Sequence, residues 1–410
     1  MLDPTPVSKP RAIYSPLFAE IVGWGKCLPP ATLSNADLST FLDTTDDWIL
    51  RRTGIRSRPI SHAPVSELAH VAALHALAAA GLRPEDLELV VLGSCTADEQ
   101  MPNTSSRIQR SIGARRAAAV DVNTACTSFM YAMSYASALI RTGTIETALV
   151  VGADTLSAYM DWNDRRPSVV FGDGAGAVVL RATDEPVGIL AEKLGCVTEQ
   201  RDVLRIKGMG TAYANAGVTY GSTEWDFDGR EVFRLAVASM ASAARAVLSK
   251  YGAGDIDDID LVIPHQANLR IVEAVARRLG ISMDKFFVNL ERCGNLSSAS
   301  IPVAFVDALE SGRIMPHGTL LAPAFGGGMT WSAHVIRWGA RVHPLSVSTT
   351  KLSSTNQTGL QLVDALRHAK GAAPSPCLPE SSYTATAPRS ATRQQLAASL
   401  FPLAVQAVPE

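Results

Sequence analysis

The sequence predicts a layered α/β protein made of two similar halves. Short, wholly apolar runs alternate with longer segments of helical pattern, which is typical of strands and helices packed in layers. Two glycine-rich turns, 172–176 and 326–328, occupy corresponding places in the two halves. The order of elements therefore recurs with a period far longer than that of a solenoid repeat, which indicates an internal duplication.

Seven short apolar runs are the expected strands. In the first half they are 89–93, 118–122, 148–152 and 176–180, and in the second half 261–264, 320–322 and 333–336. Long helices are expected at 128–140 and 267–279. The halves meet near 185–225, a segment rich in Gly, Thr and Tyr that could line a pocket.

Composition divides the chain into four parts. We expect a flexible leader at 1–17, a first half at 18–185 and a second half at 186–338. Residues 339–410 are rich in Ser, Thr, Pro and Gln, which predicts a largely disordered tail. The alternative for this tail is a small appended helical element, with helical patterns near 361–370 and 394–406.

Charge and cysteine usage exclude several classes of protein. The 410 residues carry a net charge of −2, which does not indicate a nucleic-acid-binding protein. An anionic partner would therefore have to bind a local basic patch. The six cysteines are far apart with no CxxC pair, which argues against a zinc ribbon and a disulfide framework. Reduced thiols in a cytosolic protein fit better. The longest nearly apolar stretch noted, 129–140, is too short to span a membrane, and residues 1–20 lack the order of a signal peptide, so we expect a cytoplasmic protein without membrane contact.

Cys126 is the first candidate for chemistry. It follows the strand expected at 118–122 and precedes the apolar helix that begins at Ser128. The positive end of the helix dipole and the free N–H groups there stabilise a thiolate, so we expect a lowered pKa and a nucleophile. The same N–H groups could hold the oxyanion of a thioester under attack. A lone cysteine is more commonly inert and buried, and that alternative stays open from this residue alone.

His265 and Asn295 are the second and third candidates. His265 follows 261–264 at the carboxyl end of a strand, where α/β sheets collect active-site groups. Asn295 lies in a run of small residues that predicts a tight turn leading into a helix. Each alone is more often structural. Together with Cys126 they could place a nucleophile and two hydrogen-bond donors around a carbonyl group.

Several long motifs run through residues 20–338. They include Thr45-Asp46-Asp47-Trp48-Ile49, Phe171 to Ala177, Pro264 to Ile271, and Phe325-Gly326-Gly327-Gly328 followed by Thr330-Trp331. With these motifs the chain resembles β-ketoacyl-acyl carrier protein synthase III, the family of initiating condensing enzymes in type II fatty acid synthesis. The resemblance implies the thiolase fold, in which two duplicated α/β halves form a layered αβαβα core, and a homodimer.

The resemblance also implies roles for particular residues. Cys126, His265 and Asn295 form the catalytic triad, and the backbone N–H groups of Cys126 and Gly327 form the oxyanion hole. The nucleotide end of coenzyme A is held by Trp48, Arg52 and Arg165, and its pantetheine arm by Gly229, Ala267 and Asn268. Acyl carrier protein binds Gln266, Ala267, Asn268, Leu269 and Arg270, with Arg234 nearby.

The implied reaction has two substrates. An acyl group passes from acyl-CoA to Cys126 and is then joined to malonyl-acyl carrier protein with loss of carbon dioxide, which gives β-ketoacyl-acyl carrier protein. Acyl-CoA is a substrate, and neither a metal nor a cofactor is implied. Because acyl carrier protein is acidic, a basic rim around the site would steer it despite the net charge of −2.

Three departures from the family pattern leave the acyl-chain preference open. Met101 occupies the place of a bulky residue that, in the family, reaches across the dimer interface to close the partner's acyl pocket. Residues 194–226 match poorly, and the segment after 340 has no family counterpart.

The same residues do not match several related enzymes of the thiolase fold. Biosynthetic thiolase needs a second cysteine near Gly326–Met329, elongating ketosynthases use a second histidine where Asn295 stands, and hydroxymethylglutaryl-CoA synthase uses a glutamate. A secondary-metabolite relative that uses another acyl acceptor stays credible. A catalytically silent scaffold that only binds acyl carrier protein is disfavoured by the intact triad.

Overall fold

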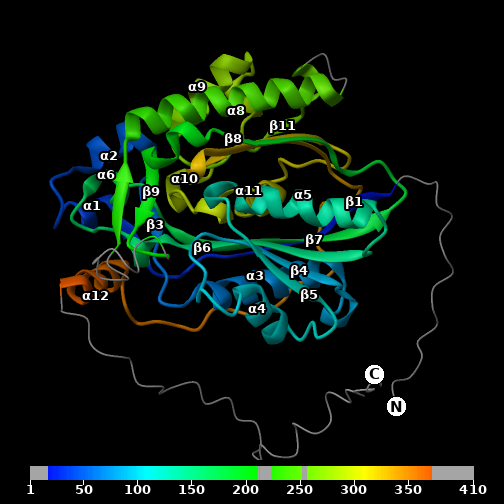
Figure 1. Ribbon diagram of the computed structural model, residues 1–410, viewed down its shortest axis with the longest axis horizontal. Helices are drawn as coiled ribbons and strands as arrows, with labels where there is room; N and C mark the ends of the chain where they lie inside the picture. Colours follow the sequence, from blue (N-terminus) through cyan, green and yellow to red (C-terminus); the bar gives the residue numbers. More distant parts are fainter. Residues whose placement is uncertain (1–16, 211, 213–222, 252–255, 372–410) are drawn as a thin grey trace, which may run out of the picture. The chain divides into compact units, whose positions relative to one another are not determined.

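The helices and sheets are stacked in five layers, in the order helix, sheet, helix, sheet, helix (Figure 1). The computed structural model describes residues 17–210, 212, 223–251 and 256–371. The predicted leader at 1–17 and the last part of the predicted tail, 372–410, lie almost wholly outside these residues. The layered αβαβα core expected from the sequence is confirmed.

The first sheet has five strands in the order β1-β7-β6-β4-β5. Their bounds are Phe18–Cys27 for β1, Leu89–Gly93 for β4, Ala118–Val122 for β5, Thr147–Thr155 for β6 and Asp173–Thr183 for β7. β4 runs parallel to β5 and β6, whereas β7 is antiparallel to β6 and β1. The strands expected at 89–93 and 118–122 agree with β4 and β5 at both ends.

The second sheet has four strands in the order β11-β12-β13-β8 and repeats the pattern of the first. The bounds are Gly188–Cys196 for β8, Leu261–Val262 for β11, Thr319–Gly326 for β12 and Thr330–Arg337 for β13. β11 is parallel to β12, and β13 is antiparallel to both β12 and β8, as in the series β4-β6-β7-β1. A parallel bridge between Val262 and Phe286 stands where the first sheet has β5. The predicted duplication is therefore visible in the strand order.

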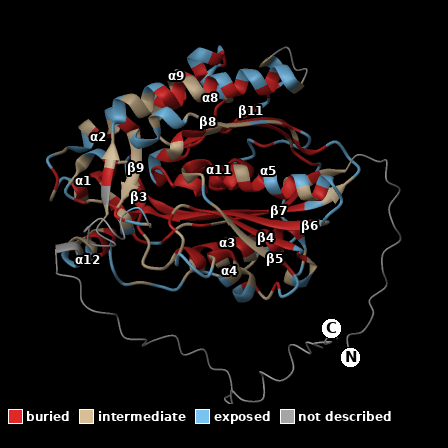
Figure 2. Ribbon diagram, viewed as in Figure 1, coloured by how far each residue is buried: buried red, intermediate tan, exposed pale blue. Residues whose placement is uncertain are grey.

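Three pairs of helices form the other layers. α3 (Val65–Ala80) and α4 (Thr104–Ile112) cover the outer face of the first sheet, and α8 (Gly229–Tyr251) and α9 (Leu269–Leu279) cover the second. α5 (Ser128–Arg141) and α11 (Ser300–Glu310) lie between the sheets and are largely buried (Figure 2). Among the described residues, α8 is long and apolar enough to cross a membrane by length and composition, but half of its apolar window is buried within this layer.

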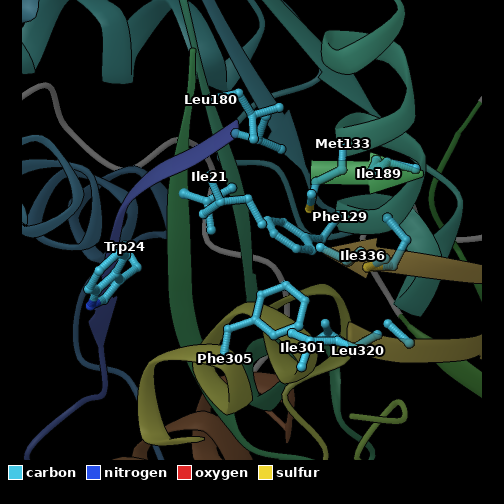
Figure 3. Close-up of a cluster of buried hydrophobic side chains, with 14 of the residues drawn as sticks. Ile21, Trp24, Phe129, Met133, Leu180, Ile189, Ile301, Phe305, Leu320 and Ile336 are labelled. Carbon is cyan, nitrogen blue, oxygen red and sulfur yellow. The ribbon is translucent and has the colours of Figure 1, made fainter. Parts of the chain in front are cut away.

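The central layer brings the two halves together through aromatic side chains (Figure 3). Phe129 of α5 packs edge-on against Phe305 of α11 with ring centroids 6.3 Å apart, and Phe305 lies 6.0 Å from Trp338. Close approach at the sheet requires glycine: a Cβ on Gly152 would lie 2.4 Å from the carbonyl oxygen of Ser298. This contact lets the start of α5 and the segment before α11 meet, which positions the site described below.

The smaller elements surround these layers. They are β2 (Thr32–Ser34), β3 (Ser57–Pro59), α1 (Asn35–Leu38), α2 (Asp46–Thr53), α6 (Arg165–Ser168), β9 (Leu204–Lys207), β10 (Glu224–Phe227), α10 (Leu290–Cys293) and α12 (Gly359–Gly371). Short 3-10 turns are η1 (Pro84–Asp86), η2 (Ala125–Thr127), η3 (Leu156–Tyr159), η4 (Thr198–Val203), η5 (Ile256–Asp258), η6 (Met283–Lys285), η7 (Ser297–Ala299) and η8 (Gly327–Met329).

The glycine-rich run 172–176 is not a turn, which corrects one expectation. It begins strand β7, and every residue of Asp173–Gly176 is buried. A Cβ on Gly176 would lie 2.8 Å from the Cβ of Pro302, so glycine serves here to let α11 approach the sheet. Glycine in a strand that another element approaches closely has the same sequence signature as glycine in a turn.

The tail predicted as disordered from 339 onward is also corrected, because residues 339–370 are part of the compact body. The helical element left open as the alternative near 361–370 is α12, in which Val363 is fully buried. The polar composition of this segment does not predict that α12 packs against the body. A few apolar residues are enough to fill a gap that the body leaves open.

Candidate active site

Cys126 lies at the junction between β5 and α5, in turn η2. Ala125 before it has a φ of +52°, a left-handed conformation that is uncommon for alanine. The hydroxyl of Ser128 accepts a hydrogen bond from the N–H of Thr124 (2.9 Å) and donates one to the carbonyl of Ala125 (2.6 Å). These bonds fix the turn, and the predicted strand-to-helix junction at Cys126 is confirmed.

Burial raises the pKa of the Cys126 thiol to about 12. The hydroxyl of Ser297 and the backbone N–H of Cys126 itself favour the thiolate, but the loss of hydration outweighs them. The lowered pKa predicted from the helix dipole is therefore wrong, because the sequence does not reveal that this residue is only 8% exposed. A thiol with this pKa is protonated at neutral pH and must lose its proton as it attacks.

His265 lies three residues beyond β11. Its backbone N–H donates to the carbonyl of Pro323 at 2.9 Å and so continues the ladder with β12. Neither ring nitrogen has a hydrogen-bond partner among the described residues, and burial lowers the pKa of the ring to about 4. A neutral imidazole offers one N–H donor and one acceptor nitrogen. A buried ring without partners is costly, so it is available to a ligand that supplies them.

Asn295 is held by bonds on both its backbone and its side chain. Its N–H donates to the carbonyl of Val170 (2.9 Å), and its carbonyl accepts from the N–H of Gly172 (3.0 Å). The side-chain oxygen accepts the N–H of Ser297 at 2.8 Å and the hydroxyl of Ser300 at 3.4 Å. Because the oxygen is engaged, the amide N–H groups are what this side chain can offer to a ligand.

One cavity of about 550 Å³ brings these three residues together. Cys126, His265 and Asn295 all line it, although they are far apart in the sequence. The rest of the lining is mostly apolar and includes Val169, Val170, Phe171, Leu204, Phe227, Val232, Phe233, Ala236, Met240, Ile271 and Phe325. The size and lining are those of a small-molecule site. The structure thus brings the three candidate residues to one cavity, and their assignment as a catalytic triad stays a prediction.

Arginine side chains supply the charge of this cavity. Arg52, Arg166, Arg230 and Arg270 belong to its lining. Arg166 is paired with Asp164 at 2.6 Å, whereas the other three form no ion pair with a carboxylate of the described residues. The local basic patch that an anionic ligand requires is therefore present, despite a net charge of −2.

Two of the predicted arginines lie against the ring of Trp48. The guanidinium carbon of Arg52 lies 4.5 Å from the centre of the Trp48 ring, and that of Arg165 lies 4.9 Å from it. Trp48 and Arg52 line the cavity, while Arg165 instead bonds to the carbonyl and carboxylate of Asp43. Guanidinium groups beside an indole form a surface suited to a flat aromatic ring with phosphates attached.

The segment predicted to bind acyl carrier protein is divided between the interior and the surface. Gln266 is 1% exposed, and its amide donates to the carbonyls of Pro264 (2.8 Å) and Phe287 (3.1 Å) and accepts from the N–H of Asn289 (3.1 Å). Its predicted contact with a partner protein is therefore wrong, because its hydrogen-bonding groups are used inside the fold. Ala267, Asn268 and Leu269 are half-buried, and only Arg270 is exposed.

The remaining predicted residues fall in three places. Gly229, Ala267 and Asn268 line the cavity, as expected of contacts to a pantetheine arm. Arg234 is exposed but paired with Glu231, and Met101 is 86% exposed; neither belongs to the cavity lining. Gly326, rather than Gly327, is a lining residue, and a Cβ on it would lie 2.8 Å from the backbone nitrogen of Cys126.

Sequence reasoning missed Arg166, Arg230 and Gly326. Arg166 follows Arg165 directly and Gly326 precedes Gly327, so in both cases the signal was one residue away. Arg230 likewise stands one residue after a predicted position, Gly229, at the start of α8. Among the described residues, no group of three or more His, Cys, Asp or Glu side chains is placed to hold a metal ion.

A duplicated five-layer core with cysteine, histidine and asparagine in one cavity defines a condensing enzyme of the thiolase fold. Models of 3-oxoacyl-acyl-carrier-protein synthase III match residues 120–197 and, for its C-terminal part, 251–338. The β-ketoacyl-acyl-carrier-protein synthase III 2 of Vibrio cholerae is 49% identical over 354 residues, which cover 86% of this chain and 98% of that one. The chain belongs to the β-ketoacyl-acyl carrier protein synthase III family.

Other relatives agree. The synthase III of Roseiflexus castenholzii is 44% identical over 327 residues, covering 79% of this chain and 99% of that protein. The crystal structure of the synthase III of Aquifex aeolicus superposes with a TM-score of 0.73 at 38% identity and covers 78% of this chain and all of that one. The priming β-ketosynthase of a polyketide pathway reaches a TM-score of 0.75 at 31% identity, over 81% of this chain and 99% of that one.

Proposed function

We propose that this protein loads an acyl group from acyl-CoA onto Cys126 and condenses it with malonyl-acyl carrier protein, thereby initiating fatty acid synthesis. The observation that carries the proposal is the presence of Cys126, His265 and Asn295 in one cavity lined by arginines. The chemistry uses these side chains and backbone N–H groups without a metal or cofactor.

The first half-reaction is a transfer between two thiols. Cys126 attacks the thioester carbonyl. The oxyanion is held by the backbone N–H of Cys126 and by that of Gly327, the residue next to the lining residue Gly326. The C–S bond to coenzyme A breaks as the new C–S bond forms. Cys126 gives up one thiol proton, and the departing coenzyme A thiolate takes up one, so the step has no net change in protons. The start of α5 favours the negative sulfur during attack.

The second half-reaction is a decarboxylating condensation. Malonyl-acyl carrier protein loses carbon dioxide, and negative charge develops on its thioester oxygen. His265 and Asn295 donate hydrogen bonds to that oxygen, with the Asn295 amide held in the donating orientation by the bond from Ser297. The resulting carbanion attacks the acyl-Cys126 carbonyl, and the C–S bond to Cys126 breaks as the new C–C bond forms. β-Ketoacyl-acyl carrier protein is released, and the Cys126 thiolate takes up a proton from water to regenerate the thiol.

The proposed setting is a cytoplasmic homodimer that docks acyl carrier protein at the arginine-lined mouth. Arg270 is exposed at the start of α9 and belongs to the cavity lining, which suits a contact with an acidic protein. Met101, at 86% exposure, is an apolar side chain that a second subunit would cover. Light scattering tests the dimer: a monomer at all concentrations would refute it.

The direct test follows the acyl group. Incubation with a panel of acetyl-, longer straight-chain and branched acyl-CoA should add one acyl group to Cys126, detected by mass spectrometry of its peptide. Later addition of malonyl-acyl carrier protein should remove that group and release carbon dioxide. Absence of the adduct for every acyl-CoA would refute the proposal, and Cys126→Ala is the control for adducts elsewhere.

A second candidate is a condensing enzyme that primes a secondary metabolite on another acceptor. The observation in its favour is the similarity to a polyketide priming ketosynthase, at a TM-score of 0.75 and 31% identity. The two candidates share the acylation of Cys126 and differ in the acceptor. Turnover with malonyl-acyl carrier protein from fatty acid synthesis supports the first, and turnover only with a different malonyl carrier supports the second.

A further inference from the structure

The segment after Trp338 distinguishes this chain from part of its family. The relative from Roseiflexus castenholzii is matched over 99% of its length by 327 residues, which leaves little room for a counterpart. The alignment with the Vibrio cholerae relative spans 354 residues, more than the 338 residues up to Trp338, so it extends into this segment. The C-terminal extension, residues 339–371, therefore belongs to a subset of the family.

The first part of the extension follows helix α3 along its length. Backbone N–H groups of Leu345 and Ser346 donate to the carbonyls of Ala79 (3.1 Å) and Ala78 (3.2 Å) at the end of the helix. Further along, the ring of His75 bonds to the carbonyl of Thr350 (2.8 Å), and that of His62 to the carbonyl of Ser353 (2.7 Å). These contacts carry the chain from the C-terminal end of α3 to the loop before its N-terminal end.

Helix α12 then docks on the region that follows β2. A Cβ on Gly359 would lie 2.3 Å from the carbonyl oxygen of Thr32, so the helix starts against the backbone of that strand. Leu362 and Val363 are buried in one apolar cluster with Leu42. The other buried members of the cluster include Leu33, Leu38, Ile49, Trp162, Phe171 and Trp225. α12 thus completes a core that also contains residues of α2 and of the cavity wall.

Contacts continue from α12 to the mouth of the cavity. The guanidinium carbon of Arg367 lies 4.5 Å from the centre of the Phe41 ring. Two residues beyond Phe41, the carbonyl and carboxylate of Asp43 accept hydrogen bonds from Arg165. Arg165 in turn lies 4.9 Å from the ring of Trp48, which lines the cavity. The loop 39–44 therefore has α12 on one side and the Trp48 cluster on the other.

We propose that α12 is a positioning element for the nucleotide end of acyl-CoA. By holding the loop 39–44, it fixes Asp43, and through Asp43 it fixes Arg165 against Trp48. The inference rests on the proposed function, because it assigns the Trp48 cluster to the nucleotide. None of the contacts of α12 described above reaches Cys126, His265 or Asn295, so we expect the maximal rate to change little when the helix is lost.

The test compares two truncations with two substrates. One variant ends at Thr358 and lacks α12, and the control ends at Gly371 and lacks only 372–410. Each is assayed for turnover with saturating malonyl-acyl carrier protein. The acyl donors are the acyl-CoA that labels Cys126 fastest and the pantetheine thioester of the same acyl group, which has no nucleotide. Loss of α12 should raise KM for acyl-CoA about tenfold with little change in kcat. KM for the pantetheine thioester should stay the same, and the control should match the full chain.

Two outcomes decide against the inference. Equal losses with both thioesters would show a general structural role for α12, and an unchanged KM for acyl-CoA would show no role. If the truncated protein does not fold, the double variant Val363→Ala with Arg367→Ala is compared with the full chain in the same assay. Failure of the proposed function looks different: the full-length protein itself would form no acyl adduct on Cys126 with any acyl-CoA.

Discussion

The buried carboxylate of Asp154 accepts a hydrogen bond from the backbone N–H of Ser298 at 3.0 Å, and this bond joins the two halves of the chain. The other oxygen accepts from backbone and hydroxyl groups of Ser94, Cys95 and Thr96 at 2.7–3.1 Å. Ser298 lies in η7, directly after the turn that carries Asn295. The carboxylate therefore fixes the turn that carries Asn295, the proposed catalytic residue of the opposite half.

Replacing Asp154 by Asn should both destabilise the protein and slow condensation. An amide presents N–H groups to at least one of the donors that the carboxylate accepts, so a buried bond is lost at a cost of about 2 kcal/mol. Urea unfolding measures the stability, and decarboxylation of malonyl-acyl carrier protein measures the site. Asp121→Asn is the control, since the hydrogen bonds that Asp121 accepts from described residues come from Thr104 and Ser105, both within the first half. Equal decarboxylation in the two variants would count against this role.

Asn295→Asp should separate the structural role of Asn295 from its catalytic role. The carboxylate keeps an acceptor for the N–H of Ser297 but removes the donor and adds negative charge beside the developing enolate. Decarboxylation should fall by at least about 10²–10³-fold, the usual loss for one oxyanion donor, and His265→Ala should lose as much. Acylation of Cys126 should survive better in both variants. If Asn295→Asp lost acylation but decarboxylated normally, the assigned role would be wrong.

The buried imidazole of His265 should make folding stability depend on pH. Its pKa is lowered by burial from 6.5 to about 4, so between these values the unfolded chain binds a proton that the folded chain does not. Stability from this residue is therefore lost as pH falls from about 6.5 toward 4, by about 3 kcal/mol in total. Burial raises the pKa of Asp173 to about 6, which acts in the opposite direction.

The contribution of His265 is therefore measured by comparing the pH dependence of stability in the unmodified protein and in a His265 variant. Urea unfolding at pH 7 and pH 5 should show a smaller loss of stability for His265→Asn than for the unmodified protein. Parallel pH dependences of the two proteins would contradict the assignment.

Arg270→Glu should impair the use of acyl carrier protein more than the use of acyl-CoA. The side chain is exposed, and its guanidinium carbon lies 6.0 Å from the Phe233 ring at the cavity mouth. Charge reversal there slows the encounter with an acidic protein, by about tenfold at low salt and less at high salt. Arg277→Glu makes the same charge change at the other end of α9 and is the control. Similar losses in both half-reactions would refute the carrier-protein contact.

The residues that the sequence identified are those with a local signature. Cys126, His265 and Asn295 each follow an apolar run or a glycine at a junction, and such junctions gather at one edge of a layered sheet. Properties set by distant residues were missed. The raised pKa of Cys126 depends on burial by the whole core, and the internal role of Gln266 depends on Phe287 and Asn289.

The docked extension was predicted only as the alternative to a disordered tail, for the same physical reason. Leu362 and Val363 do not by themselves predict a packed helix, because the surface that they fill is built by residues near 33–42 at the other end of the chain. A polar composition predicts that a segment cannot form a core of its own. It does not predict whether an existing core has room for two of its side chains.

The distribution of the cysteines affects how thiol reagents act on this protein. Cys27, Cys126 and Cys293 are buried, with pKa values raised to about 12, 12 and 11, whereas Cys196 is exposed. Among the described residues, a maleimide or an oxidant therefore meets Cys196 first. The thiol of Cys196 lies 3.3 Å from the carbonyl oxygen of Gly328, beside the turn that contains Gly327. Loss of activity after such labelling would be attributed to the nucleophile although the modified sulfur lies elsewhere, so peptide mapping must accompany any inhibitor screen based on electrophiles.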